Sequence, residues 1–171
     1  MILAAVAGLL MQAQAQSRDE RAVRVAYVYN LIQYVEWPSP GKDVTIAIAG
    51  NASTGDVMAQ LLDGKSSNGQ TIHVVRAGKN EDLQRYRIAY IADAPEGDVR
   101  RLLEKARGRD VLTLGETEEF VRAGGMVALV NTGDHIRLEV NLEAVQAAGI
   151  RISSRVLDLA TIVRPSGKGG A

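Results

Sequence analysis

The stretch that decides the fold is Arg24-Val-Ala-Tyr-Val-Tyr-Asn-Leu-Ile-Gln-Tyr-Val-Glu-Trp-Pro38, which holds four of the seven aromatic residues of the chain. Its apolar residues recur at three- and four-residue spacing, which is typical of one face of a helix. The residues predicted to face the core are Val23, Tyr27, Leu31, Tyr34 and Val35. Arg24 and Gln33 are predicted on the opposite side. Because Pro38 disfavours helical dihedrals at the residue before it, the helix should end near Glu36.

Residues 1–15 have the composition of a cleaved signal peptide. They carry no charge, and Ile2 to Met11 form an apolar run that is shorter than the ~20 residues of a membrane span. Ala13 and Ala15 form an Ala-x-Ala cleavage site, so the chain should be exported and its mature form should begin near Gln16. No Lys or Arg precedes the apolar run. The alternative is an apolar helix that stays in the protein.

Composition limits the classes of function. About 156 residues remain after cleavage, which suits one domain over residues 16–163 and a disordered tail over 164–171. The absence of cysteine excludes thiolate zinc sites, redox motifs and a cysteine nucleophile. Twenty basic and twenty acidic residues cancel, so nucleic acid is not an expected partner.

The order of elements predicts an α/β fold. Apolar runs bounded by Gly, Pro and Asn predict strands at 43–50, 71–76, 88–92, 111–115, 126–131 and 135–140. Helices are predicted at 53–63, 96–107, 116–122, 142–148 and 153–163. The last two strands are close enough only for an antiparallel hairpin. We therefore expect a single-domain three-layer sandwich: a mixed, mostly parallel sheet of about six strands with a C-terminal hairpin, and helices on both faces.

Motifs for chemistry are weak. Gly50 to Gly55 follows a strand and opens a helix, as a phosphate-binding loop does, but Asp56 and Val57 stand where that loop needs Lys and then Ser or Thr. A small anion at this helix N-terminus stays open. His73 has no second residue at metal-ligand spacing. We therefore expect no metal and no cofactor.

The polar residues of the hairpin are predicted to be solvated. His135, Arg137 and Glu139 alternate with apolar residues, so they share one face of their strand. Ser153 and Ser154 lack a nucleophile elbow, and helix capping explains them more simply. No catalytic set is found, and the protein is not expected to be an enzyme.

The segment Gly124 to Val130 is apolar on both sides of its predicted strand, and its hairpin is predicted at or near a sheet edge. An apolar edge strand needs a cover. The C-terminal helices and a second chain are equally good covers on the pattern alone.

Several motifs resemble the YfiR-like family of exported bacterial regulators. They are the run 24–38, the strands at 44–50 and 111–115, Phe120 with Gly124-Gly125-Met126, Glu139-Val-Asn141, and 149–154 with Leu157, Leu159 and Ala160. The resemblance covers residues 21 to 163. Tyr86-Arg87 stands where relatives commonly have Cys-His, so any disulfide tuning is absent.

This resemblance implies a non-enzymatic periplasmic repressor. Such a protein binds the periplasmic sensor domain of an inner-membrane diguanylate cyclase and lowers cyclic di-GMP output, and with it biofilm formation. An OmpA-like outer-membrane lipoprotein releases it. The resemblance also implies a homodimer and a partner-binding surface that includes Val127, Glu139, Val145 and Val163. The alternative function is a periplasmic small-ligand binder, resting on the turn at Gly50 to Gly55.

Overall fold

The structure, a computed structural model, describes residues 2–39, 41, 43–50, 53–78 and 81–164, with side chains from residue 16 onward. Apart from Arg164, the predicted tail 164–171 lies outside the described residues, so its disorder stays a prediction. No helix in the described part of the chain combines the length and the apolar character needed to cross a membrane.

The chain alternates strands and helices. The helices are α1 (Ile2–Gln33), α2 (Ser53–Leu62), the 3-10 turn η1 (Leu83–Arg85), α3 (Glu96–Ala106), α4 (Glu118–Arg122), α5 (Leu142–Ala147) and α6 (Ser154–Leu157). The strands are β1 (Val35–Glu36), β2 (Asp43–Ala49), β3 (Ser66–Ser67), β4 (Gln70–Arg76), β5 (Ile88–Ile91), β6 (Leu112–Gly115), β7 (Val127–Asn131), β8 (Ile136–Val140), β9 (Arg151–Ile152) and β10 (Thr161–Ile162).

The main sheet confirms the predicted fold class. Its eight strands lie in the order β10-β8-β7-β6-β5-β2-β4-β3, and β7 and β8 form the predicted antiparallel hairpin. The six predicted strands are all present, and the two-residue strands β3 and β10 add one strand at each edge. β4 pairs with one side of β2 and β5 pairs with the other, so the strand order reverses at β2.

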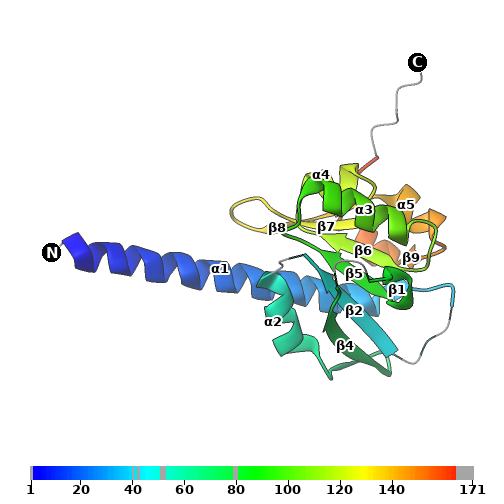
Figure 1. Cartoon of the computed structure of the whole chain (residues 1–171), viewed down its shortest axis with the longest axis horizontal. Helices are drawn as coiled ribbons and strands as arrows, with labels where there is room; N and C mark the ends of the chain where they lie inside the picture. The colour runs from blue at the N-terminus through cyan, green and yellow to red at the C-terminus, as the bar shows by residue number, and fades with distance from the viewer. Residues whose placement is uncertain (1, 40, 42, 51–52, 79–80, 165–171) are drawn as a thin grey trace, which may run out of the picture.

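Helices cover both faces of this sheet (Figure 1). α1, α2, α5 and α6 pack over a core cluster that includes Ile46, Ile88 and Leu129. α3, α4 and η1 pack over a second cluster that includes Ala47 and Ala89. Adjacent residues of one strand therefore belong to different cores, as the pleat of a strand requires.

The predicted core face of α1 is only partly correct. Leu31 and Val35 are buried, but Val23, Tyr27 and Tyr34 are 45%, 38% and 36% exposed. The face that packs on the sheet is centred instead on Val25, Val28 and Ile32, and it includes Arg24. The helix ends at Gln33 rather than Glu36, because Val35 and Glu36 pair antiparallel with Ile152 and Arg151. Trp37 is half-buried against the first core.

The C-terminal segment also differs from the prediction of a helix over 153–163. Ser153 caps α6 as expected, but α6 ends at Leu157. Thr161 and Ile162 then extend and pair in parallel with Glu139 and Val140. β-branched residues at 161–163 favour this extended form.

The apolar hairpin is covered by the same chain. β7 lies between β6 and β8, so it is not an edge strand. Val127 and Leu129 are buried in the first core, while Ala128 and Val130 are buried in the second. Of the two predicted covers, helices of this chain are therefore the one that lies over β7. β10 pairs along the outer edge of β8.

Candidate functional site

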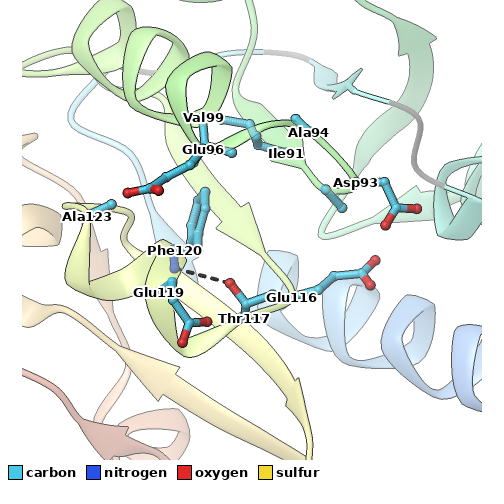
Figure 2. Close-up of a pocket in the computed structure, with 11 residues that line it drawn as sticks. Ile91, Asp93, Ala94, Glu96, Val99, Glu116, Thr117, Glu119, Phe120 and Ala123 are labelled. Carbon is cyan, nitrogen blue, oxygen red and sulfur yellow. Dashed lines mark hydrogen bonds between the residues drawn. The ribbon is translucent and has the colours of Figure 1, made fainter.

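A pocket of about 320 Å³ opens at the carboxyl ends of β5 and β6, between α3 and α4 (Figure 2). It lies next to the point where the strand order reverses between β2 and β5. In open α/β sheets, ligands bind in the crevice outside the carboxyl ends of the strands at such a reversal. The pocket is therefore the candidate site that the topology favours.

Close backbone packing shapes this end of the sheet. Gly50 has a φ of +91°, and a Cβ atom there would lie 2.2 Å from the carbonyl oxygen of Ala92. Only glycine fits both conditions. Asp93, which follows the β5 strand, also has a positive φ of 49°. The loops after β2 and β5 are thus held against each other beside the pocket.

Phe120 forms the floor of the pocket. Figure 2 shows its ring between Thr117 and the α3 segment that carries Val99. The Thr117 side chain caps α4 by accepting a hydrogen bond from the Phe120 N–H at 3.2 Å. Cβ atoms on Gly115 and Gly125 would approach the ring to 2.3 and 2.2 Å. These two glycines make room for the ring, which explains why Phe120 and Gly125 occur together in the motif of the sequence.

The rim of the pocket is acidic. Asp93, Glu96, Glu116 and Glu119 line it, and no Lys, Arg or His does among the described residues. In Figure 2 the side chains of Asp93 and Glu116 lie to the right of Phe120, that of Glu96 lies to its left, and that of Glu119 lies below it. The pocket therefore combines an apolar floor with a negatively charged rim.

Glu116 also belongs to a buried polar network. Its Oε1 accepts hydrogen bonds from Thr54 Oγ1 at 2.7 Å and from the Tyr90 hydroxyl at 2.6 Å. Burial, followed by the charge of Glu116, raises the pKa of Tyr90 far above its usual value, so this hydroxyl stays protonated and donates. The network joins β5, α2 and the start of α4.

Arg24 ties α1 to this network. Its guanidinium lies 2.6 Å from a Glu20 oxygen and 3.6 Å from Glu116 Oε2. Its Nε donates to the Leu129 carbonyl at 3.2 Å, beyond the point where β6 stops pairing with β7. Sequence reasoning placed Arg24 on the outer face and missed this role. The available signal was its helical spacing to Val28 and Leu31.

The geometry favours binding of a cationic group. The pocket offers carboxylate acceptors and apolar contacts. Within the described residues, no three His, Asp or Glu side chains are grouped to hold a metal ion.

The predicted partner-binding residues fall into two groups. Val127 and Val145 are fully buried in the first core. Val163 packs against the second core, and Glu139 is 5% exposed on β8. The prediction that Glu139 lies on a solvated face is wrong. β10 pairs alongside it, and Arg137 binds it at 2.8 Å while also reaching Glu118 of α4. A role for the four residues in partner binding stays a prediction.

The turn at Gly50 to Gly55 is only partly described, because residues 51–52 lie outside the described part of the chain. Gly55 serves packing, since a Cβ there would lie 2.5 Å from Ile48 on β2. Asp56 in the first turn of α2 is paired with Arg76. Ligand binding at this turn stays a prediction.

A protein-family model matches most of the chain. The family model described as DUF4154, YfiR/HmsC-like, matches residues 21–161. This match begins within α1 and ends at the first residue of β10.

Proposed function

The chain belongs to the YfiR/HmsC-like family, and from that membership we propose that it binds and represses the periplasmic sensor domain of an inner-membrane diguanylate cyclase. The family is periplasmic and generally regulatory rather than catalytic. Repression would lower cyclic di-GMP and reduce biofilm formation without contact between this protein and the nucleotide. The observation that carries the proposal is the family match over residues 21–161.

Release of the cyclase is assigned to an OmpA-like outer-membrane lipoprotein that sequesters the repressor, and the repressor is proposed to act as a homodimer. Residues 1–15 are proposed to direct export and to be cleaved after Ala15. Glu139 and Val163 lie on the same side of the β8–β10 edge, which we take as the partner-facing region; Glu139 is itself only 5% exposed, so a substitution there would act on binding through the packing of this edge. Val127 and Val145 support the hairpin from the opposite core. Substitutions at these two valines would act on binding through packing.

The test is a binding measurement with the protein purified from the periplasm. A complex with the periplasmic domain of a diguanylate cyclase from the same organism, together with raised cyclic di-GMP when the gene is deleted, supports the proposal. Failure to form a complex with any such domain, with unchanged cyclic di-GMP in the deletion strain, contradicts it.

The release step is tested by competition. Addition of the lipoprotein's soluble domain to the preformed complex should free the cyclase domain in a concentration-dependent way. A ternary complex that retains the cyclase domain would contradict sequestration.

A further inference from the structure

We propose that the pocket between α3 and α4 is a socket for a basic side chain, Arg or Lys, of the protein partner. This inference rests on the proposed function, because it specifies how a partner contacts this chain. It combines two independent features of the pocket, a cavity with an apolar floor and a rim with one sign of charge.

The size and floor of the cavity suit a single long side chain. Its volume of about 320 Å³ is at the lower end of the range of small-molecule sites. Phe120, Ile91 and Val99 supply apolar contact for the methylene stem of such a residue. Long basic side chains commonly bury their stems and keep the charged head at a polar boundary. Aromatic rings also attract cations that approach their faces.

Charge complementarity selects the head group. The lining carries four carboxylates and no basic side chain in the described part of the chain. A guanidinium can bind a carboxylate through two parallel hydrogen bonds, which gives both energy and orientation. An acidic side chain would be repelled by the rim side chains Asp93, Glu96 and Glu119, and a neutral amide or hydroxyl could donate to them but would lack the opposite charge.

The rim carboxylates can exchange their present partners. Glu96 pairs with Arg100 at 2.5 Å, and Glu119 pairs with Arg122 at 3.7 Å. Both are pairs within one helix between side chains that are at least half exposed. Such pairs stabilise a protein little, so a partner's arginine can replace them at small cost. Glu116 is excluded from this role, since Arg24, Thr54 and Tyr90 already hold it.

The first experiment measures the socket alone. The probe is the peptide acetyl-Gly-Arg-Gly-amide, titrated into the periplasmic protein and followed by amide chemical shifts. We expect saturable shifts at Phe120, Val99 and Ala123, at least tenfold weaker binding of the citrulline peptide, and weaker binding at high salt. Absence of saturable shifts, or equal binding of the citrulline peptide, would overturn the proposal.

Variants test which carboxylates act. The triple variant Asp93→Asn, Glu96→Gln, Glu119→Gln should reduce arginine-peptide binding about tenfold or more. The control is Glu104→Gln, because Glu104 also lies on α3 and pairs with Arg107 but does not line this pocket. Melting temperatures of both variants should match the original protein. Unchanged binding by the triple variant, or an equal loss in the control, contradicts the assignment.

The second experiment separates this inference from the proposed function. If the cyclase domain binds the original protein and the triple variant equally, the socket is wrong and the proposed function stands. If the cyclase domain binds neither protein while the arginine peptide binds as expected, the cyclase assignment fails and the socket stands. Loss of cyclase binding only in the triple variant supports both.

Discussion

The two faces of the central sheet are built from side chains of different size. The face under α1 and α2 presents large residues, and the face under α3 and α4 presents mostly alanine on the same strands. The first set is Ile46, Ile48, Ile88, Tyr90, Val127 and Leu129; the second is Ala47, Ala49, Ala89 and Ala128, with Ile91 and Val130 as its larger members. Small strand residues leave room for large helix residues such as Phe120, Leu102 and Leu103. The side-chain volume is supplied by the strands on one face and by the helices on the other.

Each face also holds one arginine network. Under α1, Arg24 joins Glu116 and the Leu129 carbonyl. Under α4, Arg137 joins Glu139 and Glu118. The first arginine has an 8% exposed side chain and the second a 35% exposed one. Removing one partner of a buried charge destabilises a protein more than removing one partner of an exposed charge. The two networks should therefore lose different amounts of stability on substitution.

The largest effect is expected from Glu139→Lys. It would place a second positive charge beside Arg137 at a position that is 5% exposed. We expect a loss of about 4 kcal/mol in the free energy of unfolding, measured by urea denaturation. Glu104→Lys, on an exposed part of α3, should change it by less than about 0.5 kcal/mol. Equal stability of the two variants would show that Glu139 is solvated.

The second largest effect is expected from Arg24→Met, with a loss of about 3 kcal/mol in the free energy of unfolding. Methionine keeps much of the apolar stem but leaves the Leu129 carbonyl and Glu116 without the guanidinium. The matched control is Arg100→Met on the opposite face, where the side chain is 68% exposed. A loss in Arg24→Met no larger than in this control would refute the network as an anchor of α1.

Gly125→Ala tests the close packing of the alanine-rich face. Its Cβ would lie 2.2 Å from the Phe120 ring, so we expect a loss of about 1–3 kcal/mol by thermal or urea unfolding. Gly97→Ala in α3 meets no atom within 4 Å and should stabilise by about 0.5–1 kcal/mol. The penalty of Gly125→Ala should shrink in a Phe120→Leu background. If Gly125→Ala loses as much stability in the Phe120→Leu background as in the original protein, the loss arises from the backbone and not from the Phe120 ring.

The smallest effect concerns acid stability. Hydrogen bonds from Arg122 and then Arg137 hold the pKa of Glu118 below its usual 4.5. A carboxyl whose pKa is lowered by folding stabilises the fold above its unfolded pKa, and this contribution is lost as pH falls through the folded pKa. Stability should therefore decline less steeply below pH 4.5 in Glu118→Gln. Arg122→Gln should raise the Glu118 pKa in an NMR titration; an unchanged value would assign the shift to Arg137.

The strands could be predicted because their signals are local. Apolar runs such as 43–50 and 88–92 are bounded by turn residues, and the connection lengths then determine which neighbours are parallel. The buried face of α1 could not be predicted, because two apolar stripes wind around this helix and only tertiary packing selects one. Burial of Glu139 depends on β10, which pairs with β8 after 20 further residues of chain.

The candidate site was predictable only in part. The sequence identified Phe120 with Gly124 and Gly125 as a motif, but the reason for it is a contact between ring and backbone that spacing does not show. Glu116 was interpreted as a helix-start residue, whereas it links Thr54, Tyr90 and Arg24. Residues that meet through long-range contacts carry no periodic signal.

Strand β10 has a practical consequence for handling this protein. Its two residues pair with Glu139 and Val140, and the Val163 N–H donates to the Val140 carbonyl at 2.8 Å, so β10 covers the C-terminal end of the outer edge of β8. A truncation after Ala160 would leave β8 as a bare template for strand addition by another polypeptide, which is how chaperones donate strands and how fibrils grow. Purification tags therefore belong after the native C-terminus, and truncated versions should be checked for strand-exchanged oligomers.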